Sequence, residues 1–144
     1  MPILNYTTAI KVEKTVGEIQ AALAKAGAKA VMFEFEGPVV TAISFRIEYN
    51  GEDISFRLPS NIQSIFKILR NDSCIPRKLR TEEQASRVAW RIIKTWLLAQ
   101  LAIVEAEQAE MAQVFLPYAQ NPATGQTVFE AMQDGGLKQL TYME

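Results

Sequence analysis

Residues 30–58 read AVMFEFEGPVVTAISFRIEYNGEDISFRL, and this stretch decides the fold. Apolar and polar side chains alternate through three runs of it, which is the pattern of half-buried strands. Gly37-Pro38 separates the first two runs, and Asn50-Gly51 separates the last two. An Asn-Gly pair between alternating runs favours a type I′ hairpin turn. The stretch therefore predicts a three-stranded antiparallel meander within an α+β fold.

Helical patterns flank this meander on both sides. Capping-box sequences begin at three positions, Thr15, Ser60 and Thr81. With the apolar periodicity that follows each of them, they predict helices over residues 16–26, 60–70 and roughly 82–113. We also expect a short strand within residues 6–12, a short helix beginning at residues 127–130, and a strand or frayed end over residues 137–142.

The third helical pattern is too long for a compact domain. A helix of roughly 33 residues would be about 50 Å long, which exceeds the diameter of a domain of this size. Part of it must therefore project, or the helix must break near its middle. We predict one domain, with the sheet and two short helices in residues 1–75 and the long helix and tail in residues 76–144.

The composition excludes several classes of function. The 144 residues contain no histidine and one cysteine, Cys74, so ordinary zinc sites, Cys–His dyads and intramolecular disulfides are ruled out. No Gly-rich phosphate loop is present, no signal peptide is recognisable, and no apolar run approaches the length of a membrane span. We expect a cytoplasmic protein that needs no cofactor or metal and is not an enzyme.

Six basic residues crowd the start of the long helical pattern: Arg77, Lys78, Arg80, Arg87, Arg91 and Lys94. The last three are spaced i, i+4 and i+7, so they share one helix face, where like charges repel each other. Such a stripe is suited to binding an anion, above all phosphate, because arginine offers bidentate donors. The alternative is a solvated helix face on which Glu83 pairs with Arg87.

Two further features each allow two interpretations. The helix is apolar nearly all round between Trp96 and Val104, which predicts either self-association through residues 90–111 or a fully buried central helix. In the hairpin, Ser44 should face Arg57 and Arg46 should face Ser55. These arginines belong either to a solvated charge ladder or to an anion pocket.

Phe115 and Tyr118 flank Leu116-Pro117 where the long helical pattern ends. They form either a hydrophobic stop for the helix or a stacking platform for a purine base. The sequence offers no convincing catalytic group. Ser86 and Lys94 are eight residues apart, so they do not meet on an isolated helix.

Several motifs resemble those of the phage anti-Thoeris sponge proteins, the first class of Thoeris anti-defence proteins. They are Leu79-Arg80-Thr81-Glu82-Glu83-Gln84-Ala85, Val88-Ala89-Trp90-Arg91-Ile92-Ile93-Lys94, Gln100-Leu101-Ala102-Ile103 and Phe115-Leu116-Pro117-Tyr118. Two early segments, Asn5-Tyr6-Thr7-Thr8 and Val12-Glu13-Lys14-Thr15, extend the likeness over most of the chain.

This resemblance implies an antiparallel sheet followed by long helices, a symmetric homo-oligomer, and a host bacterium's cytoplasm as the location. It implies capture, without cleavage, of cyclic ADP-ribose isomers, and in some members of cyclic oligonucleotides at separate sites. Chemistry alone selects the ligand-binding candidates, arginines and lysine for the pyrophosphate and aromatics for the adenine: Arg77, Arg80, Arg87, Arg91, Lys94, Phe115 and Tyr118.

Two rival functions remain open. A nucleic-acid-binding phage accessory protein would use the same basic segment, although a net charge of −1 argues against the broad basic surface that this needs. An oligomeric inhibitor of another protein is the second rival.

Overall fold

The structure is a computed structural model that describes residues 1–136. Its sheet is the predicted antiparallel meander, in the order β1 (Ala30–Glu36), β2 (Val39–Tyr49) and β3 (Glu52–Pro59). The predicted register is confirmed, since Ser44 lies opposite Arg57 and Arg46 opposite Ser55. Asn50 and Gly51 have φ angles of 52° and 81°, as a type I′ turn requires at both central positions.

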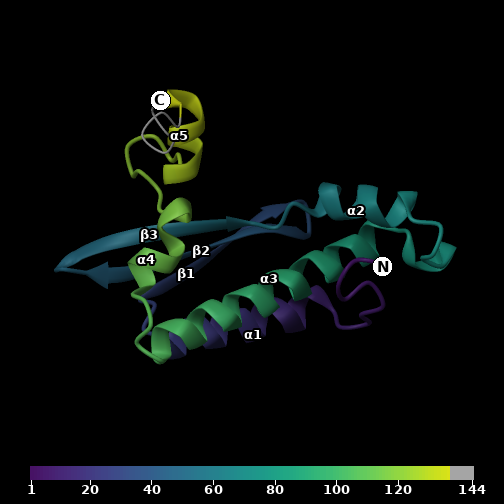
Figure 1. Ribbon diagram of the computed structural model, residues 1–144, viewed down its shortest axis with the longest axis horizontal. Helices are drawn as coiled ribbons and strands as arrows, with labels where there is room; N and C mark the ends of the chain where they lie inside the picture. Colours follow the sequence, from purple (N-terminus) through teal and green to yellow (C-terminus); the bar gives the residue numbers. More distant parts are fainter. Residues whose placement is uncertain (137–144) are drawn as a thin grey trace, which may run out of the picture.

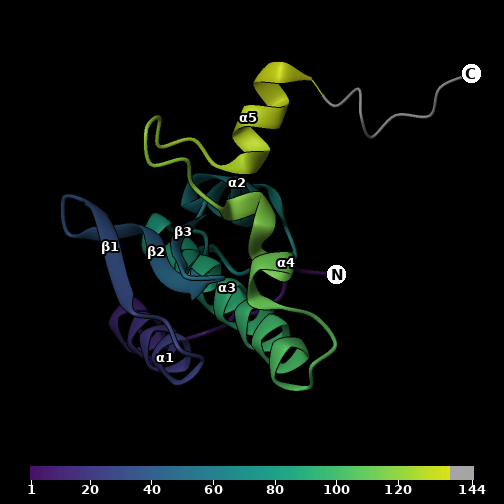
Figure 2. The same ribbon diagram turned by 90° about the vertical axis from the view of Figure 1, so that its left-hand side faces the viewer.

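Helices account for most of the remaining chain. They are α1 (Val12–Lys25), α2 (Ile62–Asn71), α3 (Glu82–Glu105), α4 (Met111–Phe115) and α5 (Val128–Gly135). Two short 3-10 turns are η1 (Arg77–Leu79) and η2 (Leu116–Tyr118). Helices α1 and α3 lie side by side against one face of the sheet, while α2 and α5 lie at two separate places outside that layer (Figures 1 and 2).

The main core lies between the sheet and the α1–α3 layer. Its largest fully buried side chains are Trp90, Phe45, Phe56 and Phe115. The indole N–H of Trp90 donates to the carbonyl oxygen of Val40 at 3.1 Å, so the one polar atom of this ring is satisfied. A second, smaller cluster around Leu69 and Ile75 joins α2 to the N-terminal segment.

Two of the predicted N-terminal features are wrong. Residues 6–12 form no strand, and α1 begins at Val12 rather than at residue 16. Thr15 is buried inside α1, where its hydroxyl donates to the carbonyl oxygen of Lys11 at 3.4 Å instead of capping the helix. Packing against the core therefore overrides the local capping signal.

The capping boxes that begin at Ser60 and Thr81 have different outcomes. Ser60 donates its hydroxyl to the carbonyl oxygen of Thr41 at 2.8 Å, and α2 starts one residue later, from Asn61 in the left-handed conformation. Thr81 caps α3 as predicted and accepts from the backbone N–H of Gln84 at 3.1 Å.

The long helix ends at Glu105, so its predicted extension to residue 113 is wrong. Glu107 has a φ of 59°, and α4 then starts as a separate helix capped by Glu110. The break turns the chain back toward the sheet, where Phe115 enters the core. The predicted helix near residue 127 is confirmed as α5, whereas the prediction for residues 137–142 lies outside the described residues.

Candidate functional site

Two of the three basic residues of the helical stripe, Arg91 and Lys94, contact α1, whereas Arg87 bonds to residues of α3 itself. Glu18 of α1 accepts from Arg91 at 3.4 Å and also pairs with Lys94, and Arg91 donates to the hydroxyl of Thr15 at 3.3 Å. Arg87 pairs with Glu83 at 2.9 Å, as the alternative interpretation of the stripe predicted. All three basic side chains are half-buried. The repulsion within the stripe is therefore compensated by carboxylates of the same chain.

The electrostatics of this α1–α3 seam favour charged partners. The hydrogen bond from Lys94 is the main reason why the pKa of the Glu18 carboxyl lies below its ordinary value, and the positive charges of Arg91 and Lys14 add to the effect. An ionised Glu18 held by two cations makes the seam a structural ion-pair network.

Arg77 and Arg80 lie elsewhere, at the end of the molecule formed by α2 and η1. We call this surface the basic end, and it consists of Lys67, Arg70, Arg77, Lys78 and Arg80. Arg80 donates to the carbonyl oxygens of Ile75 and Ser73, and Arg70 lies over the ring of Phe66 at 5.1 Å. Within residues 1–136, none of the five forms a salt bridge with a carboxylate.

The prediction that Phe115 binds the ligand is wrong. Its side chain is fully buried, with Phe45 at 5.3 Å and Trp96 at 5.7 Å between ring centroids. A ring enclosed in this way cannot stack on a ligand, so Phe115 is a core residue at the end of α4. Tyr118 is only half-buried and packs edge-on against Trp96 at 5.5 Å.

Tyr118 lines a cavity of about 360 Å³ between β3, η2 and α5, which we call the aromatic corner. Its other lining residues are Arg57, Pro59, Asn61, Pro117, Thr127, Phe129 and Glu130. An adjoining cavity of about 330 Å³ shares Pro59, Asn61 and Tyr118 and continues toward Trp96. The two cavities form a groove with aromatic, amide and charged groups on its walls.

Arg57 is the cation of the aromatic corner. Its Nε and Nη2 donate to the two carboxylate oxygens of Glu34 at 2.7 and 3.1 Å. This hydrogen-bonded pair lowers the pKa of Glu34 and raises the pKa of Arg57. The pairing supports the predicted charge ladder on the sheet, to which the salt bridge from Arg46 to Asp53 also belongs.

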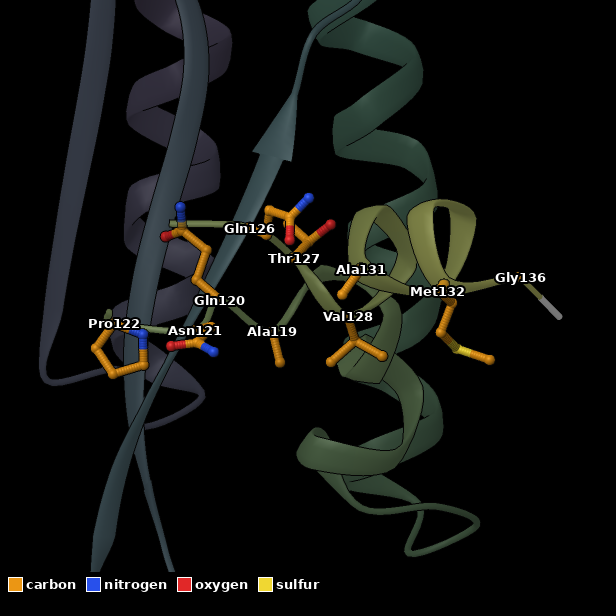
Figure 3. A pocket seen from close by; sticks show the side chains of 11 residues that line it. Ala119, Gln120, Asn121, Pro122, Gln126, Thr127, Val128, Ala131, Met132 and Gly136 are labelled. Carbon is orange, nitrogen blue, oxygen red and sulfur yellow. The ribbon is translucent and has the colours of Figure 1, made fainter. Parts of the chain in front are cut away.

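Helix α5 has cavities along both of its sides. Phe129 and Glu130 face the aromatic corner, whereas Val128, Ala131 and Met132 line a cavity of about 870 Å³ on the other side (Figure 3). Gln120, Asn121 and Pro122 form the opposite wall of that larger cavity. None of the α5 residues is fully buried, and Val128 is the α5 side chain that packs against the main core.

The seven predicted binding residues do not converge in one protomer. Tyr118 contacts α3 at Trp96, which is five residues beyond Arg91 and therefore about 140° around the helix axis from it. The basic stripe and the aromatic corner consequently lie on opposite sides of α3. Arg77 and Arg80 occupy a third place, at the start of the helix.

Sequence reasoning missed two members of the aromatic corner, Phe129 and Asn61. Phe129 follows a recognisable capping box, and its exposure is 50%. The signal that could have identified Phe129 is a large aromatic residue in the first turn of a short helix. Asn61 had none, because its place in the groove depends on how the end of β3 meets η2.

Further findings bear on the class of protein. Among residues 1–136, no group of three or more His, Cys, Asp or Glu side chains is placed to hold a metal ion. Over the same range, every helix is too short or too polar to cross a membrane. Comparisons with protein families, curated proteins and solved structures find no match to this chain.

Proposed function

We propose that the protein reversibly captures a cyclic nucleotide signal, a cyclic ADP-ribose isomer above all, and does not cleave it. The observation that carries this proposal is the aromatic corner, where the half-buried Tyr118 and the exposed Phe129 line one cavity with Arg57. Aromatic faces stack on purine bases with little dependence on sequence. The resemblance to the anti-Thoeris sponge proteins supports the same ligand class.

The phosphates of such a ligand need cations beyond Arg57. Glu34 already occupies two of the donors of Arg57, and Glu130 also lines the cavity. Within the proposal, the basic end of a second protomer supplies the remaining positive charge, because its cations have no carboxylate partner in residues 1–136. The ligand then lies between two subunits, which also encloses it.

Self-association through the second half of α3 is part of this proposal. Leu98 is exposed, and with Leu101 and Ala102 it lines an apolar cavity of about 380 Å³ against Ala22 and Ala26 of α1. Trp90 and Leu97, which lie within the predicted interface of residues 90–111, are fully buried in their own protomer. The remaining interface is thus limited to the outer side of α3.

Calorimetry with a panel of cyclic ADP-ribose isomers and cyclic di- and trinucleotides tests the function. We expect micromolar or tighter binding of one of them, and recovery of the intact compound after the protein is denatured by heat. Recovery of an altered compound would identify an enzyme instead. Absence of binding across the panel at micromolar concentration would refute the proposal.

Variants locate the site within the same assay. Tyr118→Ala and Phe129→Ala should each weaken binding about tenfold or more, since base stacking on an aromatic side chain is worth roughly 1–3 kcal/mol. Arg77→Ala combined with Lys78→Ala should also weaken it, whereas Lys11→Ala, at an exposed lysine just before α1, serves as the control. If only Arg87→Ala and Arg91→Ala reduce affinity, the function stands and the site lies in the α1–α3 seam.

Nucleic-acid binding is the second candidate, and the basic end is the observation that favours it. None of its five cations forms a salt bridge within residues 1–136, and the carboxylate of the neighbouring Asp72 accepts from the backbone N–H of Cys74 at 2.9 Å. Binding through phosphates alone would fall steeply with salt. A strong, saturable gel shift with DNA at physiological salt, lost in the double variant of Arg77 and Lys78, would establish this function instead.

A further inference from the structure

The two edges of the sheet differ in whether another segment of the chain pairs with them. At the β3 edge, Ala119 forms a bridge with Phe56, and the N–H of Gln120 donates to the carbonyl oxygen of Ser55 at 2.8 Å. The outer edge of β1 has no partner strand within residues 1–136. Figure 2 shows β1 at the margin of the molecule, with α1 beneath the sheet rather than beside it.

The β1 edge has little of the usual protection against pairing. Edge strands are normally guarded by charged side chains, lysine above all, by proline or by a bulge in the strand itself. Residues 30–36 contain no lysine or proline, and the extra residue of the nearby bulge, Thr41, belongs to β2. Met32 and Phe35 are 59% and 62% exposed. The carboxylate of Glu34 is held by Arg57, which neutralises the charge nearest the middle of the edge.

We propose that β1 pairs antiparallel with β1 of a second copy, so that two three-stranded sheets join into one. A twofold axis through Phe33 is the register that uses all seven residues of the strand. It places Phe33 opposite Phe33, Val31 opposite Phe35, Met32 opposite Glu34 and Ala30 opposite Glu36. The apolar side chains then form one continuous row across the junction on the core face of the sheet.

The neighbouring registers are less favourable. An axis through Glu34 sets two carboxylates directly opposite each other, which is destabilising, and an axis through Met32 pairs only five residues of each strand. In the register through Phe33, the two Glu36 side chains lie at opposite ends of the junction.

The backbone groups of β1 are oriented so that this pairing is possible. The carbonyl oxygen of Glu34 accepts from the Thr41 hydroxyl on β2 at 3.3 Å, so it points inward. Successive carbonyls of a strand alternate between its two edges, and that of Phe33 therefore points outward, where it can pair with its copy. This isologous contact is self-complementary, as twofold symmetry requires. It is separate from the contact through α3.

Light scattering coupled to size exclusion tests this pairing without any ligand. The wild-type chain should elute with at least twice the 16.1 kDa mass of one protomer. Phe35→Lys should halve that mass and raise the dissociation constant at least about tenfold, because it introduces a charge opposite Val31 of the second copy. Leu116→Lys, at a side chain 53% exposed on η2, is the matched control and should leave the mass unchanged.

Two results would overturn the proposal. One is a wild-type chain that is monomeric at tens of micromolar. The other is a Phe35→Lys chain that keeps the wild-type mass, including the case in which only Leu98→Glu on α3 dissociates the assembly. Circular dichroism checks that the variants fold.

Spin labels measure whether the two β1 strands lie side by side as this register requires. A spin label at Met32→Cys, in a Cys74→Ser background, should show dipolar broadening, because the two labelled positions lie within roughly 10 Å in the paired strands. A label at Leu116→Cys should remain narrow. Equal, narrow spectra at both positions in a wild-type-sized assembly would place the interface elsewhere and reject this pairing.

Discussion

The α1–α3 layer and the aromatic corner contain the same kinds of residues, yet they use them in different ways. In the layer, Arg91 and Lys94 share Glu18, and in the core that the layer covers, Phe115 is enclosed by other aromatic rings. In the corner, Tyr118 and Phe129 border open cavities. Side chains that the folded chain already pairs or encloses, as it does Arg91, Lys94 and Phe115, are not available to a ligand, whereas those that border a cavity are.

The largest effect on stability is expected from the replacement of Phe115, which tests this comparison. Phe115→Ala should lower the free energy of unfolding by about 3–5 kcal/mol, since it opens a cavity among packed rings. Phe129→Ala, the same substitution in the corner, should change it by less than about 0.5 kcal/mol, because that side chain is exposed. Urea denaturation measures both. Similar losses for the two variants would mean that the corner is packed in solution as tightly as the core.

The sheet was predictable from sequence because its information is local. Alternating side chains and the Asn50-Gly51 turn fix both the strands and their register, so the pairing of Ser44 with Arg57 followed directly. Helix starts were less predictable. The capping signal at Thr15 gave way to burial of that residue against the core, which depends on the tertiary structure.

The candidate site was predictable only in part. Tyr118 was named from its chemistry, but Phe115 beside it became core, and no local pattern separates the two. The partner of the basic stripe, Glu18, precedes it by more than 70 residues, so its role depends on α1 lying along α3. Phe129 joins Tyr118 only because the chain returns along the edge of β3 through Ala119.

Glu18 offers the next test, with a smaller expected effect. Glu18→Gln removes the shared carboxylate and leaves two half-buried cations, Arg91 and Lys94, close to each other. The urea midpoint at neutral pH should fall, by less than in Phe115→Ala. Glu13→Gln, which changes an exposed carboxylate on the same helix, should have little effect. Equal midpoints for the two variants would show that the seam contributes nothing to stability.

The loss of stability in Glu18→Gln should depend on pH, and it should be smaller in acid than at neutral pH. The pKa of Glu18 is lowered from its ordinary value of 4.5, first by the hydrogen bond from Lys94, although partial burial opposes the shift. A carboxyl with a lowered folded-state pKa stabilises the protein above the unfolded value, and this contribution disappears as the pH falls through the folded-state value. The difference in urea midpoint between wild type and Glu18→Gln should therefore be largest at pH 6–7 and should shrink below about pH 4.5. A difference that grows on acidification would contradict this assignment.

Removal of the N-terminal cap of α5 should have the smallest effect on global stability and a clear effect on the local stability of that helix. The Thr127 hydroxyl accepts from the N–H of Glu130 at 3.2 Å, and the Glu130 carboxylate accepts from the N–H of Thr127 at 2.9 Å. Loss of such a cap costs about 1 kcal/mol of helix stability. No residue of α5 itself is buried, and although the Thr127 side chain is, alanine keeps its Cβ. Thr127→Ala should therefore shift the urea midpoint only slightly.

Hydrogen exchange should detect the local loss instead. Amide protection within α5 should fall about fivefold in Thr127→Ala, while protection in α3 stays constant, because local opening has its own free energy. Thr124→Ala is the matched control, since the Thr124 hydroxyl accepts from the N–H of Gln126 outside the helix. If Thr127→Ala instead lowers protection in α3 or shifts the urea midpoint, α5 is coupled to the core, and the aromatic corner is as tightly partnered as the α1–α3 layer.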